Sequence, residues 1–341
     1  MNVRIRPLTI VALVLSLALM LSACSGKNGE PSTSSSASPE PTIASSPSHE
    51  PSPASPFPRT ISAANGSITI QEAPKKVAVV HWGYTDSMLL FDLDSLAVVL
   101  PFTEKQSVLS TESYKPYIDR LDELTIVGEN TSVNLEALLA YAPDLIIAGN
   151  ATNTEITAEL EKIATTVILD EEKANIWGDW PSVVTAFGEI LGQEDAAEKY
   201  IAEYRELLST AKEKLTQVEG SVAFVQVREK AVWLQGTDYL KPYYEGLGLK
   251  APEGEEASNG AEITLEGLSK LDPDHLFLGY FNYSDKSIPA LTDEWDDSAV
   301  WSKLKSVQKD QLYAINGELA LGYGPIGNTY GVNAVLAALD K

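Results

Sequence analysis

Short apolar runs alternate with helical patterns along residues 74–180. A helical pattern over Ser87–Phe91 lies between the first two of these runs, and each run has the length and composition of a buried strand. Strand, loop, helix and strand in this order form the unit of a parallel α/β sheet. We therefore predict an N-terminal lobe over residues 59–180, with strands at Val77–Val80, Val98–Leu100, Leu145–Ile147 and Val167–Leu169.

The next segment, residues 181–219, has a helical pattern throughout. Pro181 suits the first position of a helix, and Gly192 predicts a break. From Glu194 onward, a helix of about 24 residues would be about 36 Å long, which is enough to pass from one lobe to another. Its apolar stripe, with spacings of three and four residues, comprises Ala197, Tyr200, Ile201, Tyr204, Leu207, Leu208 and Ala211.

Beyond this helix the strand signal returns. Four apolar runs with strand composition follow one another in the last third of the chain. They predict a C-terminal lobe over residues 220–341, with strands at Ser221–Val227, Ala231–Leu234, Leu276–Leu278 and Leu312–Ile315.

One short motif occurs twice, at residues 134–146 and again at residues 264–276. Each copy opens with a good N-cap residue, continues with apolar positions at helical spacing, and ends in Pro-Asp before an apolar strand. The repetition predicts an α/β fold with two Rossmann-like lobes, whose central sheets are joined by the long interdomain helix. A ligand cleft is expected between the lobes. The motif also places one Glu at an equivalent point on each lobe, Glu136 and Glu266.

The N-terminus has the pattern of a lipoprotein export signal. Arg4 and Arg6 precede an apolar run that is too short to span a membrane and that closes on Leu-Ser-Ala-Cys. We predict a signal peptide over residues 1–23 and lipidation of Cys24, the only cysteine, which therefore has no disulfide partner within the chain. A secretory signal with an incidental cysteine is the alternative. One lipidated cysteine predicts a protein anchored to the membrane rather than spanning it.

Residues 25–58 contain 11 Ser and 8 Pro among 34 positions. Such a segment has too few large apolar side chains to offset the loss of conformational entropy that ordering would cost. We therefore predict that residues 24–58 form a disordered tether. The positive and negative charges of residues 1–58 cancel, so the full net charge of -23 belongs to residues 59–341. This acidity makes nucleic acid and anionic lipid surfaces poor partners.

Ligands on α/β lobes bind at the carboxyl ends of strands, so the loop after the first strand is the first place to look. Trp82 and Tyr84 lie there, and each offers a flat apolar ring with a polar tip. Packing between the lobes is the alternative role for both. His81 is expected to be a hydrogen-bonded histidine at the strand end, and His275 a strand residue. No His/carboxylate cluster in the sequence has the spacing of a metal site.

The chain resembles one family through a combination of features. These are the export signal, the tether, residues 127–147 with their Asn-Leu-Glu and Pro-Asp-Leu-Ile-Ile, the long central helix and Trp301–Val307. The chain is similar to the iron-siderophore solute-binding lipoproteins of ABC importers, which are relatives of the ferrichrome- and cobalamin-binding proteins. The resemblance implies a bilobal fold, a shallow cleft for a ferric chelate and no intrinsic cofactor or directly bound metal. It also implies a monomer on the extracytoplasmic face of the cell membrane that delivers its ligand to permease subunits with an associated ATPase. Glu136 and Glu266 match the positions that dock on the permease in that family.

Arg228 resembles the position where this family places a cation, and its guanidinium suits the oxygens of carboxylate, hydroxamate or catecholate groups. A surface ion pair with Glu229 is the alternative. Further candidates for the cleft are Trp180, Trp233, Tyr239, Tyr280, Tyr283 and Tyr323.

Other functions remain open at this point. A cobalamin- or haem-binding protein of the same fold is one alternative, and a sensor or adhesin is another. A lipid-anchored exported enzyme is more remote, because the sequence contains no Gly-x-Ser-x-Gly, His-Glu-x-x-His or P-loop motif. Gly322–Gly327 matches a dinucleotide-binding pattern, but Pro325 interrupts it and no βαβ unit follows. The scarcity of basic residues disfavours triscatecholates and favours hydroxamate or citrate-type chelates.

Overall fold

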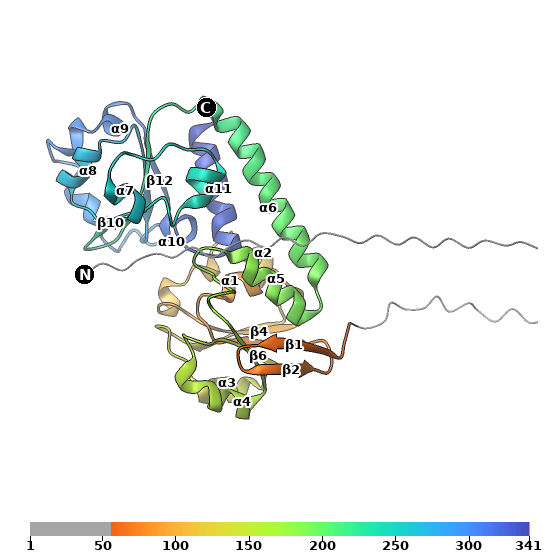
Figure 1. Cartoon of the computed structure of the whole chain (residues 1–341). Helices are drawn as coiled ribbons and strands as arrows, with labels where there is room; N and C mark the ends of the chain where they lie inside the picture. Colours follow the sequence, from red (N-terminus) through yellow and green to blue (C-terminus); the bar gives the residue numbers. More distant parts are fainter. Residues whose placement is uncertain (1–55, 341) are drawn as a thin grey trace, which may run out of the picture. The chain divides into compact units, whose positions relative to one another are not determined.

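Two five-stranded sheets organise the protein (Figure 1), whose computed structural model describes residues 56–340. In the first sheet all neighbouring strands are parallel, in the order β5-β4-β3-β6-β7. The chain thus starts in the middle of the sheet, extends to one edge, and then crosses over to build the other side. The strands are β3 (Lys76–Val79), β4 (Ser95–Val99), β5 (Glu123–Gly128), β6 (Leu145–Gly149) and β7 (Thr165–Leu169).

The second sheet repeats this order of strands, as β10-β9-β8-β11-β12. It is mixed, because β8, β11 and β12 run parallel whereas β9 is antiparallel to both β8 and β10. Two lobes of similar build, as the repeated motif predicts, are therefore confirmed. The strands are β8 (Val222–Val227), β9 (Val232–Leu234), β10 (Ala261–Glu262), β11 (His275–Tyr280) and β12 (Leu312–Asn316).

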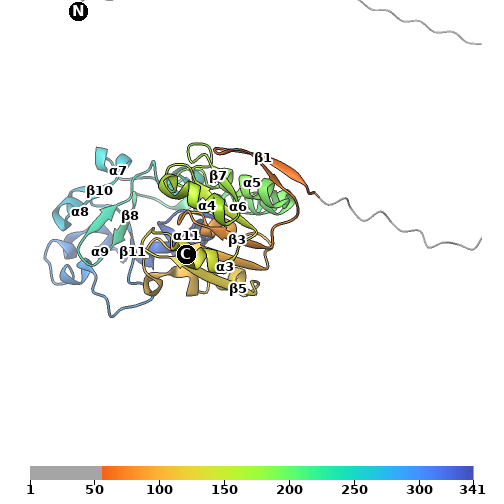
Figure 2. The same cartoon turned by 90° about the horizontal axis from the view of Figure 1, so that it is seen from below.

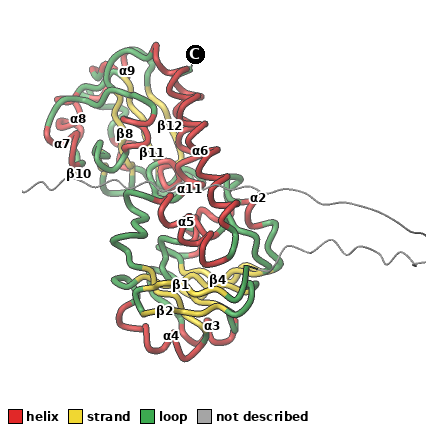
Figure 3. The backbone as a smooth tube through the Cα atoms, turned by 45° about the vertical axis from the view of Figure 1, so that its right-hand side comes forward, coloured by secondary structure: helices red, strands yellow, loops and turns green. Residues whose placement is uncertain are grey.

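Helices cover both faces of the N-terminal sheet. Figures 1 and 3 show α3 (Leu135–Tyr141) and α4 (Thr157–Ile163) on one face, with α1 (Thr85–Met88), α2 (Lys115–Ile118) and α5 (Trp180–Leu191) on the other. The C-terminal lobe contains α7 (Glu255–Asn259), α8 (Leu265–Leu271), α9 (Lys305–Gln308), α10 (Gly317–Ala320) and α11 (Pro325–Leu339). Short 3-10 turns lie at Glu104–Gln106, Val108–Ser110, Thr154–Ile156, Leu215–Gln217, Leu291–Glu294 and Trp301–Lys303, and a π-turn at Pro242–Gly246.

Strand side chains alternate between separate cores, as the period of two requires. In β3, Val77 and Val79 contribute to a central core, whereas Ala78 belongs to the core beneath α3 and α4. Phe224 of β8 lies in the same central core as Val77 and Val79. The central core therefore extends through both lobes.

The helical segment between the lobes agrees with its sequence pattern. α5 ends at Gly192, which adopts a left-handed φ of 67°, and α6 (Glu194–Lys214) follows with 21 residues. At about 1.5 Å per residue α6 is about 32 Å long, slightly shorter than predicted. Figure 1 shows it passing alongside both lobes. The predicted stripe is buried or packs against the central core, in which Ile201 and Tyr204 are buried.

Matching hydrogen bonds cap the two copies of the repeated motif. Asn134 accepts from the N–H of Ala137 at 3.0 Å, and Thr264 accepts from that of Gly267 at 3.1 Å. Downstream of each helix, an Asp carboxylate then binds the backbone at the start of the lobe's first strand. Asp144 accepts from the N–H groups of Lys75 and Lys76, and Asp274 accepts from that of Ser221. The hydrogen bond from the N–H of Ser221, together with the ammonium group of Lys309, lowers the pKa of Asp274 to about 2.

Three features were not predicted. The hairpin β1 (Arg59–Ala63) and β2 (Gly66–Ile70) lies beside β7, and Figure 2 shows β1 near β7. The edge strand β5 has only Val127 fully buried, so its apolar pattern is weak. Phe57 falls within the predicted tether but is buried in the central core, so that boundary was wrong and the folded body begins earlier. The signal peptide, Cys24 and most of the tether lie outside the described residues.

Candidate functional site

A cavity of about 350 Å³ lies where the carboxyl ends of β3 and β8 approach each other. Both are first strands of their sheets, next to the crossover to β6 or β11, which is where α/β sheets commonly bind ligands. The N-terminal lobe contributes Trp82, Gly83, Thr85, Asp86, Leu100–Thr103, Gln106–Leu109 and Tyr114 to the lining. The rest comes from Trp177 and, in the C-terminal lobe, Gln226, Arg228, Tyr239, Phe281, Glu318 and Leu321–Tyr323.

Three aromatic side chains from distant parts of the chain form one wall. Trp82 follows β3, Trp177 precedes α5, and Tyr323 lies between α10 and α11. Their ring centroids are 5.1 Å apart for Trp82 and Trp177, 5.5 Å for Trp82 and Tyr323, and 4.6 Å for Trp177 and Tyr323. We call these three residues the aromatic triad. It presents a broad apolar surface with polar edges to the cavity.

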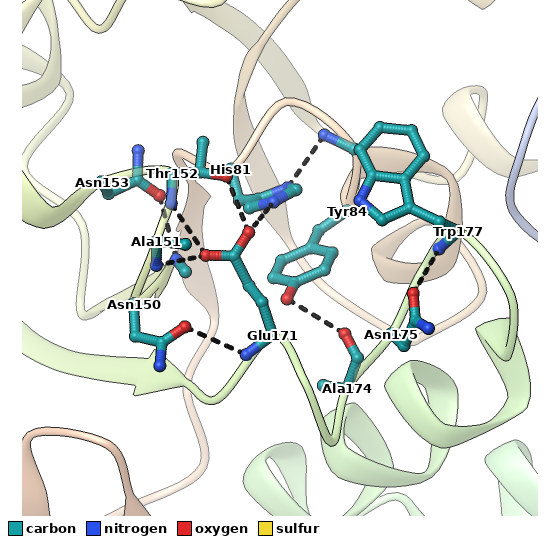
Figure 4. A network of polar contacts seen from close by, with 12 residues as sticks. His81, Tyr84, Asn150, Ala151, Thr152, Asn153, Glu171, Ala174, Asn175 and Trp177 are labelled. Carbon is teal, nitrogen blue, oxygen red and sulfur yellow. Dashed lines mark hydrogen bonds and ion pairs between the residues drawn. The ribbon is translucent and has the colours of Figure 1, made fainter. Parts of the chain in front are cut away.

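Trp82 lies directly after a rigid polar network, which Figure 4 shows. Nδ1 of His81 accepts from the N–H of Gly83 at 3.0 Å, so Nε2–H donates to Glu171 at 2.9 Å. Burial lowers the pKa of His81, which keeps the ring neutral. Burial opposes ionisation of Glu171, but hydrogen bonds from Thr152 and Ala151 nevertheless hold its pKa below the usual range. His81 is therefore the hydrogen-bonded strand-end histidine that we predicted.

Arg228 is an exposed cation at the end of β8. Its guanidinium lies 4.4 Å from the ring centroid of Phe281 and donates to Gln226 at 3.3 Å. Among the described residues 56–340, no carboxylate lies within 4.0 Å of it. The structure therefore shows no ion pair between Arg228 and Glu229, and the guanidinium is available to bind a ligand.

Two carboxyl groups also line the cavity. Glu318 lies on α10, and burial raises its pKa to about 7 while the charge of Arg228 opposes this shift. Asp86 lies on α1, and burial likewise raises its pKa to about 7. The buried hydroxyl of Thr85 has no hydrogen-bond partner within the described chain, so it is available to a bound molecule.

Asp86 also connects the two lobes. It accepts from the N–H groups of Ile326 and Gly327 at 3.0 and 3.2 Å, and from the hydroxyl of Tyr114 at 3.0 Å. A Cβ on Gly324 would lie 2.5 Å from this carboxylate, and Gly324 has a positive φ of 96°, so the turn before α11 requires glycine. The position of Tyr323 next to this turn therefore depends on Asp86.

A second cavity, of about 370 Å³, adjoins the first. The two share Arg228, Phe281 and Glu318, together with part of the segment after β4. Lys105, Glu229 and Asp285 line the second cavity only. The two cavities therefore form one groove, with Arg228 and Glu318 where they meet.

Four of the nine predicted ligand residues line this groove, and five do not. Tyr84 has no exposed surface: its ring stacks on His81 at 3.9 Å, and its hydroxyl donates to the carbonyl of Ala174. Trp180 is buried against Tyr204, with centroids 5.0 Å apart. Burial thus keeps Tyr84 and Trp180 from the groove. The four predicted ligand residues that line the groove are Trp82, Arg228, Tyr239 and Tyr323.

The other three residues lie outside the groove. Trp233 is on β9 with 41% of its surface exposed. Tyr280 and Tyr283 flank Lys286, whose ammonium lies 4.5 and 5.2 Å from their ring centroids. Trp233 is the middle residue of β9 and Tyr280 the last residue of β11. Tyr283 lies in the turn after β11, where its neighbours Asn282 and Ser284 line the second cavity but Tyr283 itself does not.

The sequence analysis missed several residues of the groove. Trp177 and Phe281 lie on connections and Glu318 on the short helix α10, and only the packing of the two lobes decides how these segments meet. For Glu318 one signal was present, because Asn316 is a good N-cap and its side chain accepts from the N–H groups of Glu318 and Leu319. This cap predicts a helix start after β12, at the carboxyl edge of the sheet.

Glu136 and Glu266 occupy equivalent exposed places, in the first turns of α3 and α8. Neither side chain forms an ion pair with another described residue. Within residues 56–340 no group of three or more His, Cys, Asp or Glu side chains could hold a metal ion. Over the same range, no helix is both long and apolar enough to cross a membrane.

Comparison with known proteins agrees with this architecture. The Fe(3+)-citrate-binding protein YfmC of Bacillus subtilis is 27% identical over 258 residues, covering 75% of this chain and 77% of that protein. The iron(3+)-hydroxamate-binding protein YxeB of the same organism is 24% identical over 348 residues, covering 97% and 96%. The structure of the iron-uptake system-binding protein FeuA from Bacillus subtilis superposes with a TM-score of 0.66 at 22% identity, covering 82% of this chain and 100% of that one.

The family described as periplasmic binding protein matches residues 77–319, from the first strand of the N-terminal sheet to the helix that carries Glu318. The match therefore includes both sheets and α6, together with most of the residues that line the groove. This protein belongs to the periplasmic binding protein family.

Proposed function

We propose that this protein captures a ferric siderophore outside the cytoplasm and delivers it to the permease of an ABC importer. The observation that carries the proposal is the groove between two similar lobes, where the aromatic triad and the guanidinium of Arg228 line the same cavity. Among the described residues, no carboxylate forms an ion pair with this guanidinium. A ferric chelate has an apolar rim and exposed oxygen atoms. The aromatic triad can pack against the apolar rim, and Arg228 can donate hydrogen bonds to the oxygen atoms.

The names of the relatives support the same ligand class. One is named for Fe(3+)-citrate and another for iron(3+)-hydroxamate. The iron would arrive already coordinated, because the groove supplies no cluster of metal ligands among the described residues. Hydroxamate or citrate-type chelates are the proposed cargo, and the protein acts as a carrier rather than an enzyme.

The proposal includes the parts of the chain outside the described residues. Residues 1–23 would be removed as a signal peptide, Cys24 would carry the lipid, and the tether that follows would hold the protein at the extracytoplasmic face. Relatives named as lipoproteins support this arrangement.

Ligand-induced quenching of tryptophan fluorescence tests the proposal. The purified protein is titrated with ferrioxamine B, a ferric citrate-hydroxamate, ferric enterobactin, haem, cobalamin and, as a control, free iron. We expect saturable submicromolar quenching by at least one ferric chelate. A response to haem or cobalamin alone would assign a different cargo, and no response to any of them would contradict carriage of these ligands.

The source of the signal can be located with paired variants. Trp82→Phe combined with Trp177→Phe should remove most of the quenching, because both rings line the cavity. Trp233→Phe is the matched control, since Trp233 lies on β9 away from the groove. Equal losses in the two proteins would show that the ligand does not bind against the triad.

Glu136 and Glu266 are proposed to dock on the permease, one from each lobe. The double variant Glu136→Ala/Glu266→Ala should keep its affinity for the chelate but lower radioactive iron uptake by cells about tenfold or more, because two charge-assisted contacts are lost. Glu159→Ala/Glu255→Ala is the matched control, with one exposed first-turn Glu removed from each lobe. Similar uptake by both double variants would contradict the docking role.

A further inference from the structure

Glu318 places a carboxyl group in the ligand groove. Its side chain forms no hydrogen bond or ion pair with another described residue, yet it lines both cavities where they meet. Its backbone is held in place, because Asn316 caps its N–H at 3.1 Å. A fixed acid in a partly buried groove is costly unless something pairs with it.

The charges of the groove do not favour an anionic ligand. Among the described residues that line the first cavity, Arg228 is the one cation, against the carboxyl groups of Asp86 and Glu318. In the second cavity, Lys105 is offset by Glu229 and Asp285. Ferric complexes of triscatecholates and citrates carry negative charge, which Glu318 would repel. A neutral or cationic chelate meets no such penalty.

The groove also has the surroundings that an ammonium group prefers. Aromatic faces attract a cation, and the triad, Tyr239 and Phe281 line the same cavity as Glu318. Arg228 is near enough for its charge to lower the pKa of Glu318, but no ion pair joins the two residues. One ligand could therefore place its oxygens on Arg228 and a positive group on Glu318 at the same time.

We propose that Glu318 binds a protonated amine of the ligand and so selects amine-bearing, uncharged-core ferric chelates of the trihydroxamate type. This inference rests on the proposed function and narrows its ligand class. The chelate core would lie against the aromatic triad with its hydroxamate oxygens toward Arg228. The alkylammonium group would reach Glu318 and neutralise the carboxylate.

The test compares ferrioxamine B, which has a free terminal ammonium, with N-acetylferrioxamine B, in which the same chelate lacks that charge. Dissociation constants are measured by fluorescence titration of the full chain at pH 8, where Glu318 is ionised. The wild-type protein should prefer the free amine about tenfold, the size expected for one charge-assisted contact. Glu318→Gln should bind both chelates equally.

Glu262→Gln is the matched control, because Glu262 is exposed on β10 and lines neither cavity; it should retain the preference. Thermal unfolding midpoints verify that each variant is folded. If the wild-type protein binds both chelates equally, the inference fails while the proposed function stands. If Glu318→Gln keeps the preference, Glu318 is not the subsite. Tighter binding of ferric citrate than of either chelate would also overturn it, and binding of no ferric chelate would overturn the proposed function itself.

A pH series provides a second measurement. The preference for the free amine should grow as pH rises from 6 to 8, because Glu318 loses its proton around pH 7. The Glu318→Gln variant should bind the two chelates with equal affinity at every pH. This result would separate the titration of Glu318 from that of the other groups in the groove. Those groups are Arg228, Asp86, Tyr114, Tyr239 and Tyr323 in the first cavity, and Lys105, Glu229 and Asp285 in the second.

Discussion

Arg228→Ala is expected to weaken binding of a ferric chelate about 10- to 100-fold, with little change in stability. A hydrogen bond to a charged group contributes about 1.5–3 kcal/mol, and a guanidinium can form two with the oxygens of one chelate. The side chain is exposed, and its guanidinium makes a 3.3 Å hydrogen bond to Gln226 and a cation–π contact with Phe281, both at the surface of the groove, so the fold does not depend on it. Its backbone hydrogen bonds with Ala231 and Leu291 remain in the variant. Fluorescence titration gives the affinity, and thermal unfolding gives the stability.

Two further variants make this result specific. Arg228→Lys keeps the charge but loses the planar pair of donors, so its affinity should lie between those of the wild type and Arg228→Ala. Lys230→Ala removes an exposed cation two residues away that lines neither cavity, and should bind normally. A similar loss in Lys230→Ala would indicate that the net charge of the surface, rather than the guanidinium in the groove, attracts the ligand.

Asp86→Ala is expected to have the largest effect on stability, about 3–5 kcal/mol. The substitution leaves three donors without an acceptor, the N–H groups of Ile326 and Gly327 and the hydroxyl of Tyr114, and each unsatisfied buried group costs about 1–3 kcal/mol. It also loosens the turn that carries Tyr323, so chelate affinity should fall as well. Urea denaturation measures the free energy of unfolding.

Asp92→Ala is the control for this prediction, because Asp92 is an exposed acid of the same lobe whose side chain makes no hydrogen bond with a described residue. Asp86→Asn tests the role of charge. Burial raises the pKa of Asp86 from 3.8 to about 7 in the folded protein. Between these values the unfolded chain loses a proton that the folded protein keeps, so the wild type should lose stability relative to Asp86→Asn as pH rises from 4 to 7. A difference that does not vary with pH would contradict the raised pKa.

Local hydrogen bonding explains why the repeated motif could be read from the sequence. Asn134 and Thr264 each cap a helix through a contact three residues away, and Pro143 and Pro273 follow the left-handed residues that end these helices. These interactions depend on neighbours in the sequence. The stripe of α6 was equally readable, because one face of a long helix must be buried whatever covers it.

Edge elements were harder to predict because half of their surface remains in contact with solvent. β5 has one fully buried residue, Val127, and the β1–β2 hairpin has Ile61 and Ile70. Phe57 follows a Ser- and Pro-rich segment, so composition alone assigned it to the tether. Its burial depends on α5, whose terminal Gly192 leaves room for the ring.

The sequence by itself determined the two-lobed α/β plan, the helix between the lobes, and the presence of Trp82 and Arg228 at strand ends, because these follow from short-range periodicity and capping. Only the tertiary structure decided which aromatic rings meet, since Trp82, Trp177 and Tyr323 come from three distant connections. It also decided that Tyr84 and Trp180 are buried and that Asp86 joins the lobes. The physical reason is that a groove between lobes is built from long-range contacts, and local pattern does not encode which loops will face each other.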